Sequence, residues 1–195
     1  MILGAVLAGG LSRRMGRDKA QVPVLGRTML ERVAGALGEV ADAVIMAGRT
    51  DLEGWEGVPD PGERRAGPLG GLVAALARGG ELGATAVVLV AVDQPFVRAR
   101  TLRHLLEAFD GAAVVPVADG VRQVTCAVYP VAWLDDARVE LAAGGSIQSL
   151  LDRQAHVAVP PRRWTEWGED GASWFSTDDE ATLVAGLDRF GSRLE

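Results

Sequence analysis

The chain has 195 residues, a formal net charge of -6 and a hydrophobic fraction of 48%, so we expect residues 1–195 to form a single domain with a sizeable core. The negative charge argues against nucleic acid as the main partner, and the apolar runs are all too short for a membrane span. Ile2 to Leu7 is also too short for a signal peptide, and Cys126 has no second cysteine to pair with, so we expect a cytoplasmic protein without an internal disulfide.

Strand-like and helix-like segments alternate along the first two thirds of the chain. The predicted strands are Ile2 to Leu7, Ala43 to Ala47, Thr85 to Val92 and Ala112 to Val117, and the predicted helices are Thr28 to Leu37, Pro68 to Ala77 and Thr101 to Phe109. Alternation of this kind is typical of a parallel sheet covered by helices. We therefore predict an α/β fold, a Rossmann-like three-layer αβα sandwich with a mostly parallel sheet.

A turn signal predicts some antiparallel pairing in the C-terminal half. Ala118-Asp119-Gly120 separates two β-branched runs, Val114 to Val117 and Val124 to Val128. Short turns with Asp-Gly join neighbouring antiparallel strands.

The remaining segments are less regular. Val131 to Leu141 is predicted to be a helix that ends at Gly144-Gly145, and Ser146 is predicted to cap another short helix. Pro160-Pro161 opens a stretch rich in tryptophan, glycine and acids, for which we expect a loop. The acidic residues from Glu166 to Glu180 are expected to form a solvated face.

A glycine-rich, basic segment follows the first strand directly. It reads Leu7-Ala8-Gly9-Gly10-Leu11-Ser12-Arg13-Arg14-Met15-Gly16-Arg17-Asp18-Lys19-Ala20. Glycines leave backbone N–H groups uncovered, so a polyphosphate can come close to the main chain, and arginine and lysine supply positive charge to the same turn. Because the protein as a whole is acidic, this local reversal of charge favours a nucleotide-binding loop over an ordinary surface turn.

Acidic residues are expected near the same edge of the sheet. Asp93 ends the strand Thr85 to Val92, and Asp60 follows the region after the second strand. Ligands of open α/β sheets bind at the carboxyl ends of strands, close to the point where the strand order reverses. A carboxylate there can hold a hard divalent cation over the phosphates of a nucleotide, so Asp93 is a candidate metal ligand.

The first segment resembles the signature of the molybdenum cofactor guanylyltransferase family, LAGGxSxRMGxDK, at every specified position. The resemblance continues along nearly the whole chain, in the family's order, through Pro59-Asp60, Gly67 to Leu72, Val92 to Phe96 and, more faintly, Trp174 to Asp178. Members of this family are nucleotidyltransferases, so the resemblance implies a nucleotidyltransferase domain.

The resemblance also implies roles for individual residues. Arg14, Lys19 and Asp93 would be catalytic, with Arg14 and Lys19 neutralising a triphosphate and Asp93 holding Mg²⁺. Asp178 falls where more distant relatives keep a second metal ligand or substrate contact. The other nucleotide-binding positions are Leu7, Ala8, Gly9, Gly10, Ser12, Asp60, Pro68, Leu69 and Gly70.

The implied reaction is transfer of GMP from GTP to the terminal phosphate of molybdopterin, with release of pyrophosphate and with Mg²⁺ as cofactor. The implied partners are GTP and molybdopterin or the molybdenum cofactor, with molybdoenzymes or cofactor-insertion proteins as further candidates. Neither nucleic acid nor a membrane is expected to bind.

Other functions remain open on the sequence alone. A cytidylyltransferase acting on the same cofactor shares the fold and the loop; Leu7-Ala8-Gly9-Gly10 favours guanine, whereas Asp93-Gln94-Pro95 is common among the cytidylyl relatives. Transfer to a sugar or alcohol phosphate is a wider alternative. A nucleotide-binding accessory module without turnover is a third, against which the intact Lys19 and Asp93 argue.

We predict structural roles for both histidines and for three of the five tryptophans. His104 lies in a periodic helix and His156 borders a strand, so neither is a catalytic candidate. Trp164, Trp167 and Trp174 could stack on a pterin, but we favour packing for all three. Cys126 is interpreted as a core residue of a strand.

Overall fold

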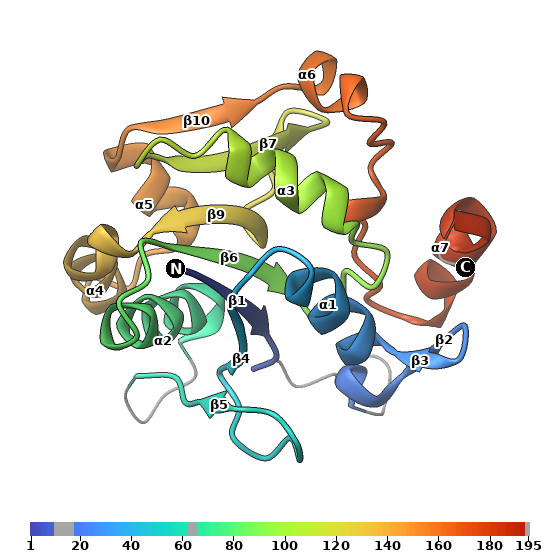
Figure 1. Ribbon diagram of the computed structural model, residues 1–195, viewed down its shortest axis with the longest axis horizontal. Coiled ribbons are helices and arrows are strands. Elements are labelled where there is room, and N and C mark those ends of the chain that lie inside the picture. Colours follow the sequence, from blue (N-terminus) through green and yellow to red (C-terminus); the bar gives the residue numbers. More distant parts are fainter. Residues whose placement is uncertain (10–17, 62–65, 194–195) are drawn as a thin grey trace.

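The computed structural model describes residues 1–9, 18–61 and 66–193. In these ranges the chain forms three layers, a mixed eight-stranded sheet between two layers of helices (Figure 1). This confirms the predicted α/β sandwich. None of the helices in the described ranges is long and apolar enough to cross a membrane.

The strands are β1 (Ile2–Leu7), β2 (Pro23–Val24), β3 (Arg27–Thr28), β4 (Ala43–Ala47), β5 (Gly57–Val58), β6 (Ala86–Ala91), β7 (Ala113–Ala118), β8 (Val121–Arg122), β9 (Cys126–Pro130) and β10 (His156–Val159). The α-helices are α1 (Met29–Gly38), α2 (Gly67–Glu81), α3 (Ala99–Glu107), α4 (Leu134–Ala142), α5 (Ile147–Arg153), α6 (Pro161–Glu166) and α7 (Glu180–Phe190). Four short 3₁₀ turns join them within these ranges, η1 (Lys19–Gln21), η2 (Val131–Trp133), η3 (Ala172–Trp174) and η4 (Gly191–Arg193).

Strand β1 is the point where the strand order reverses. The sheet runs β10-β7-β9-β6-β1-β4-β5, so β1 lies between β4 and β6 and is parallel to both. Its last residue, Leu7, pairs with Ala47 of β4 and with Ala91 of β6. The carboxyl ends of three parallel strands therefore meet at one edge, where ligands of such sheets bind.

Antiparallel pairing occurs in the C-terminal half, as predicted, but with a different partner across the turn. Asp119 and Gly120 both have positive φ, 51° and 75°, and they connect β7 to the short strand β8 rather than to β9. Strand β9 is antiparallel to β6 and to β7 and lies between them.

The sheet is apolar on both faces because alternate residues of each strand point to opposite sides. In β6, Val88 and Val90 join the core cluster beneath α1 and α3, whereas Val87 and Leu89 join the cluster beneath α2, α4 and α5. Figure 1 shows these two helical layers. The edge of the sheet between the layers remains accessible at the strand ends.

Helix α1 begins at its predicted cap. The Thr28 hydroxyl accepts from the Glu31 N–H, and the Glu31 carboxylate accepts from the Thr28 N–H. These two hydrogen bonds satisfy backbone donors that a helix start leaves unpaired. The bond from the Thr28 N–H to the Glu31 carboxylate also lowers the pKa of Glu31. The predicted Ser146 cap is also present, at α5.

The expectation of a loop after Pro160-Pro161 is wrong. Pro161 is the first residue of α6, a position where the missing N–H of proline costs nothing, and η3 and α7 follow. The solvated-face interpretation is also wrong for Glu169, whose side chain is buried and accepts from the hydroxyls of Thr101 and Ser173. The bond from Thr101 ties the C-terminal segment to α3.

Candidate active site

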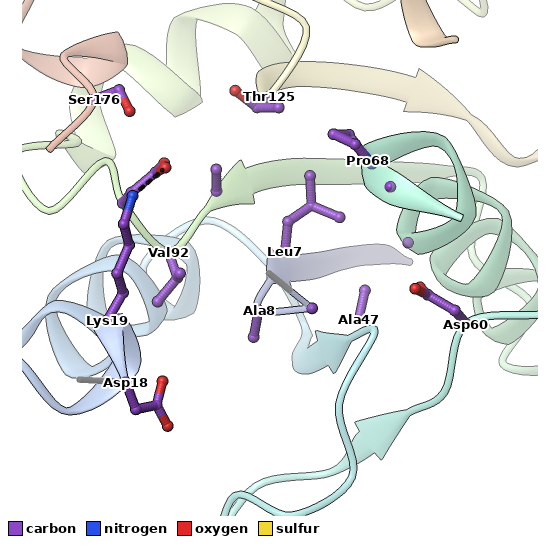
Figure 2. A pocket seen from close by; sticks show the side chains of 15 residues that line it. Leu7, Ala8, Asp18, Lys19, Ala47, Asp60, Pro68, Val92, Thr125 and Ser176 are labelled. Carbon is purple, nitrogen blue, oxygen red and sulfur yellow. Dashed lines mark hydrogen bonds and ion pairs between the residues drawn. The ribbon is translucent and has the colours of Figure 1, made fainter. Parts of the chain in front are cut away.

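A cavity of about 300 Å³ opens at the carboxyl ends of β1, β4 and β6 (Figure 2). Its walls come from the ends of these strands, the start of η1, the start of α2 and two segments from the C-terminal half. The lining residues are Leu7, Ala8, Gly9, Asp18, Lys19, Ala47, Asp60, Gly67, Pro68, Gly71, Ala91, Val92, Asp93, Thr125 and Ser176.

One wall is built from main chain packed closely against main chain. Gly48 has φ +86°, and a Cβ there would lie 2.9 Å from the Cα of Gly9 and 3.1 Å from Asp60 Oδ1. Glycine at position 48 therefore lets the loop after β4 approach both the end of β1 and the Asp60 carboxylate. This close packing fixes the segment Leu7 to Gly9 relative to Asp60.

Asp60 and Lys19 lie on opposite sides of the cavity, with Leu7, Ala8 and Ala47 between them (Figure 2). Beside Asp60 is the start of α2, where Gly67 and Pro68 line the cavity and no side chain caps the helix among the described residues. The cavity thus has an end with a carboxylate and a helix start, and an end with an ammonium group.

The Lys19 ammonium group contacts two carboxylates. Its Nζ lies 3.3 Å from Asp93 Oδ2 and 2.9 Å from Asp178 Oδ1. The Lys19 side chain is 16% exposed, against 25% for Asp93 and 50% for Asp178. Residues from η1, from the end of β6 and from the segment before α7 therefore form one charged cluster at the cavity wall.

The backbone at Lys19 is fixed by its neighbour Asp18. The Asp18 carboxylate accepts from the Ala20 N–H and so caps η1. The same carboxylate accepts from Arg49 Nη1 at 2.8 and 2.7 Å, while Nε and Nη2 of Arg49 donate to Asp51. Hydrogen bonds to Asp51 and Asp18 raise the pKa of Arg49, which keeps this cation charged.

Asp93 and Asp178 suit a magnesium ion that also binds phosphate. Mg²⁺ in nucleotide sites commonly uses one or two protein carboxylates and takes its other ligands from phosphate oxygens and water. The described residues contain no group of three or more His, Cys, Asp and Glu side chains placed to enclose a metal. Asp93 and Asp178 are the carboxylates at this wall that could contribute ligands to a cation that also binds a nucleotide.

The structure brings most of the predicted site residues together. Seven line the cavity: Leu7, Ala8, Gly9, Lys19, Asp60, Pro68 and Asp93. Asp178 joins them through Lys19. Leu69 and Gly70 are buried behind the start of α2 and do not line it. Gly10, Ser12 and Arg14 lie outside the described residues, and their roles stay predictions.

Eight lining residues were not among the predicted site residues: Asp18, Ala47, Gly67, Gly71, Ala91, Val92, Thr125 and Ser176. Ala47 ends β4, and the same strand-end argument that found Asp93 could have found it. Gly71 lies one turn into α2, where a Cβ would meet the Leu7 side chain. Thr125 precedes the antiparallel strand β9. The turn signal predicted that this segment pairs with β7, but it did not indicate that β9 also pairs with β6.

The residues given structural roles have structural partners. His104 stacks on Trp167 and contacts Glu107, and His156 Nδ1 contacts the Gln154 carbonyl oxygen. Trp164 packs edge-on against Trp174 and donates its Nε1–H to the Val117 carbonyl. Cys126 is fully buried, and burial raises the pKa of its thiol, which disfavours the nucleophilic thiolate.

The chain is similar to known proteins of one nucleotidyltransferase family. Residues 4–158 match the family model described as MobA-like NTP transferase domain. The molybdenum cofactor guanylyltransferase of Cereibacter sphaeroides is 36% identical over 147 residues, which are 73% of this chain and 76% of that protein. A probable molybdenum cofactor guanylyltransferase of Opitutus terrae is 38% identical over 150 residues, 73% of each chain.

A solved structure extends the likeness to the whole fold. Molybdopterin-guanine dinucleotide biosynthesis protein A from Archaeoglobus fulgidus has a TM-score of 0.81 and 23% identity, over 97% of this chain and 99% of that one. The family model covers residues 4–158, and the two named relatives are 36% and 38% identical to this chain. This chain belongs to the family of MobA-like nucleotidyltransferases.

Proposed function

We propose that this chain transfers GMP from GTP to the terminal phosphate of molybdopterin and releases pyrophosphate. The observation that carries the proposal is the cluster of Lys19, Asp93 and Asp178 at one end of a cavity whose other end holds Asp60. The names of the relatives from Cereibacter sphaeroides and Opitutus terrae support the choice of nucleotide and acceptor.

The proposed reaction needs charge neutralisation rather than a general base. A phosphate oxygen of the acceptor attacks the α-phosphorus of GTP, and the bond from this phosphorus to the oxygen of the β-phosphate breaks. The attacking phosphate is already anionic at neutral pH, so the obstacle is repulsion between anions. A cavity lined by lysine and aspartate, with no histidine among its described lining residues, suits this chemistry.

In this proposal, Lys19 binds the triphosphate and Asp93, with Asp178, holds Mg²⁺. The ammonium group of Lys19 can donate to phosphate oxygens and lower the repulsion that the attacking phosphate meets. When bound, Mg²⁺ would neutralise charge on the phosphates of the nucleotide. We assign Arg14 to the triphosphate as well, on the motif alone.

The Asp60 end of the cavity is assigned to the base. A carboxylate can accept from the N–H groups on the Watson–Crick edge of guanine, and the backbone of Leu7 to Gly9 borders the same space. A base that leaves buried polar groups unpaired loses about 1–3 kcal/mol for each of them. Recognition at this end would therefore favour GTP over nucleotides with a different pattern of donors.

Pyrophosphate release tests the proposal directly. The purified protein is incubated with Mg²⁺, molybdopterin and, separately, GTP, CTP or ATP. We expect release with GTP well above that with CTP or ATP, and dependent on molybdopterin. Faster release with CTP would replace the proposal with cytidylyl transfer, and binding of GTP without any release would favour an accessory module.

A further inference from the structure

Thr177, in the segment before α7, makes two hydrogen bonds to the chain just after β6. The Thr177 N–H donates to the carbonyl oxygen of Asp93 at 2.8 Å, and the Thr177 hydroxyl donates to the same oxygen at 3.0 Å. Thr177 is completely buried. This segment lies outside residues 4–158, the part of the chain that matches the family model.

The neighbours of Thr177 belong to the site. Ser176 lines the cavity, and the Asp178 carboxylate contacts Lys19 at 2.9 Å. Asp93, which provides the accepting carbonyl, places its own carboxylate 3.3 Å from the same Lys19 nitrogen. The two hydrogen bonds of Thr177 therefore connect the backbones that carry both carboxylates.

Loss of the Thr177 hydroxyl would be hard to compensate. Because Thr177 is buried, water cannot easily supply a second donor to the Asp93 carbonyl if the hydroxyl is lost. The hydroxyl also lies 3.6 Å from the sulfur of Met29, at the start of α1, and the nearer carbonyl oxygen is the stronger acceptor. Without the hydroxyl, one hydrogen bond in place of two would join Thr177 to the Asp93 carbonyl.

We propose that Thr177 is a positioning residue for the divalent cation, because its hydroxyl holds Asp93 and Asp178 at the spacing that the cation needs. The proposal rests on the proposed function in taking Asp93 as a metal-binding residue. Mg²⁺ demands near-ideal octahedral geometry, so small displacements of its carboxylates weaken binding. Groups that orient metal ligands typically change metal affinity by about 10–100-fold when they are removed.

Two comparisons between variants test the effect of removing the Thr177 hydroxyl. Thr177→Val removes it at nearly constant volume. Thr177→Ser and Thr177→Ala differ from each other by the hydroxyl alone, which keeps the comparison valid if valine does not fit. Thr85→Val is the matched control, since the Thr85 hydroxyl also lies within reach of a backbone carbonyl, that of Met1, at the opposite end of β6.

The first measurement is binding of Mn²⁺ to each variant in the presence of saturating GTP and without acceptor, followed by electron paramagnetic resonance. We expect Thr177→Val and Thr177→Ala to weaken Mn²⁺ binding about tenfold or more. Thr177→Ser and Thr85→Val are expected to bind Mn²⁺ like the unmodified protein. Asp93→Asn serves as the reference for loss of a metal-binding carboxylate.

The second measurement is the Mg²⁺ concentration that gives half-maximal pyrophosphate release, which should rise in the same two variants and return to normal with serine. Equal Mn²⁺ binding by the serine and alanine variants would overturn the proposal, as would failure of both hydroxyl-free variants to fold, which would make Thr177 purely structural. An unmodified protein that releases no pyrophosphate would refute the proposed function, while Mn²⁺ binding would still decide the role of Thr177.

Discussion

Lys19 contacts two carboxylates through one ammonium group, and its proposed role is to bind phosphate. An ammonium group carries three N–H donors, and phosphate oxygens accept strong, charge-assisted hydrogen bonds from such donors. Loss of this group would remove the attraction for the triphosphate. It would also leave the two carboxylates to repel each other and the incoming phosphates.

Replacement of Lys19 by alanine is expected to weaken GTP binding about tenfold, which corresponds to about 1.4 kcal/mol, and to slow transfer. Arg17→Ala is the control, because position 17 is unspecified in the signature motif although it lies in the same basic segment. Isothermal titration calorimetry with GTP measures both variants. Equally small effects of the two substitutions would contradict the role given to Lys19.

Asp93 should matter for turnover far more than for folding. Asparagine has nearly the same shape as aspartate, and Lys19 keeps the Asp178 carboxylate as a partner at 2.9 Å, so we expect Asp93→Asn to fold normally. We expect turnover to fall by about 100-fold or more, equivalent to about 2.7 kcal/mol or more of transition-state stabilisation. Steady-state kinetics and a thermal melt measure the two properties. Near-normal turnover at saturating Mg²⁺ would show that Asp93 does not hold the metal.

At the scale of elements, the loop after β4 supports the turn that carries Lys19. Arg49 joins Asp51 in its own loop to Asp18 at the start of η1. Figure 2 shows Asp18 and Lys19 next to each other at the wall of the cavity. Because Asp18 caps η1, its position decides where the Lys19 side chain begins.

Arg49→Ala is therefore expected to weaken GTP binding about tenfold, or about 1.4 kcal/mol, although Arg49 itself does not line the cavity. Arg78→Ala provides a matched control, since Arg78 also joins two carboxylates, Glu56 and Glu81, away from the site. Fluorescence titration with a labelled GTP analogue compares the two. If both variants bind GTP like the unmodified protein, the arginine bridge does not position η1.

Local signals predicted the elements that form the first half of the fold. The Thr28–Glu31 cap and the apolar run of β6 are contained in short stretches of sequence, and both were found at or within one residue of their predicted places. The C-terminal elements depend on distant partners instead. Glu169 is buried because Thr101, 68 positions away, donates to it, and no periodicity in its own segment indicates this.

At the scale of the whole molecule, local sequence signals predicted one side of the cavity, whereas the other side depends on contacts between segments far apart in the sequence. The residues at the ends of β1 and β6 could be predicted because parallel strands end at one edge and the strand order reverses at β1. Thr125 and Ser176 could not be placed with them. The position of Thr125 depends on the insertion of β9 between β6 and β7. The position of Ser176 depends on the return of the chain to Asp93 after α6.

Because the cavity joins segments from the first strand to the start of α7, ligand binding should stabilise the chain as a unit. At a free GTP concentration of about 100 times its dissociation constant, the gain is about 2.7 kcal/mol. For a chain of this size each kcal/mol raises the melting temperature by about 2–4 °C, so we expect a rise of about 5–10 °C. A single domain, which stays a prediction, should melt in one transition.

Differential scanning calorimetry with GTP, CTP or ATP at equal concentration measures this effect, in Mg²⁺ and again after chelation of the metal. We expect the largest rise with GTP and Mg²⁺. The rise should be smaller with CTP or ATP, because their bases present a different pattern of donors to the Asp60 end of the cavity, and it should be reduced without metal. A larger rise with CTP would reassign the base. Two separate transitions, of which GTP shifts one alone, would show that residues 1–195 do not unfold as one domain.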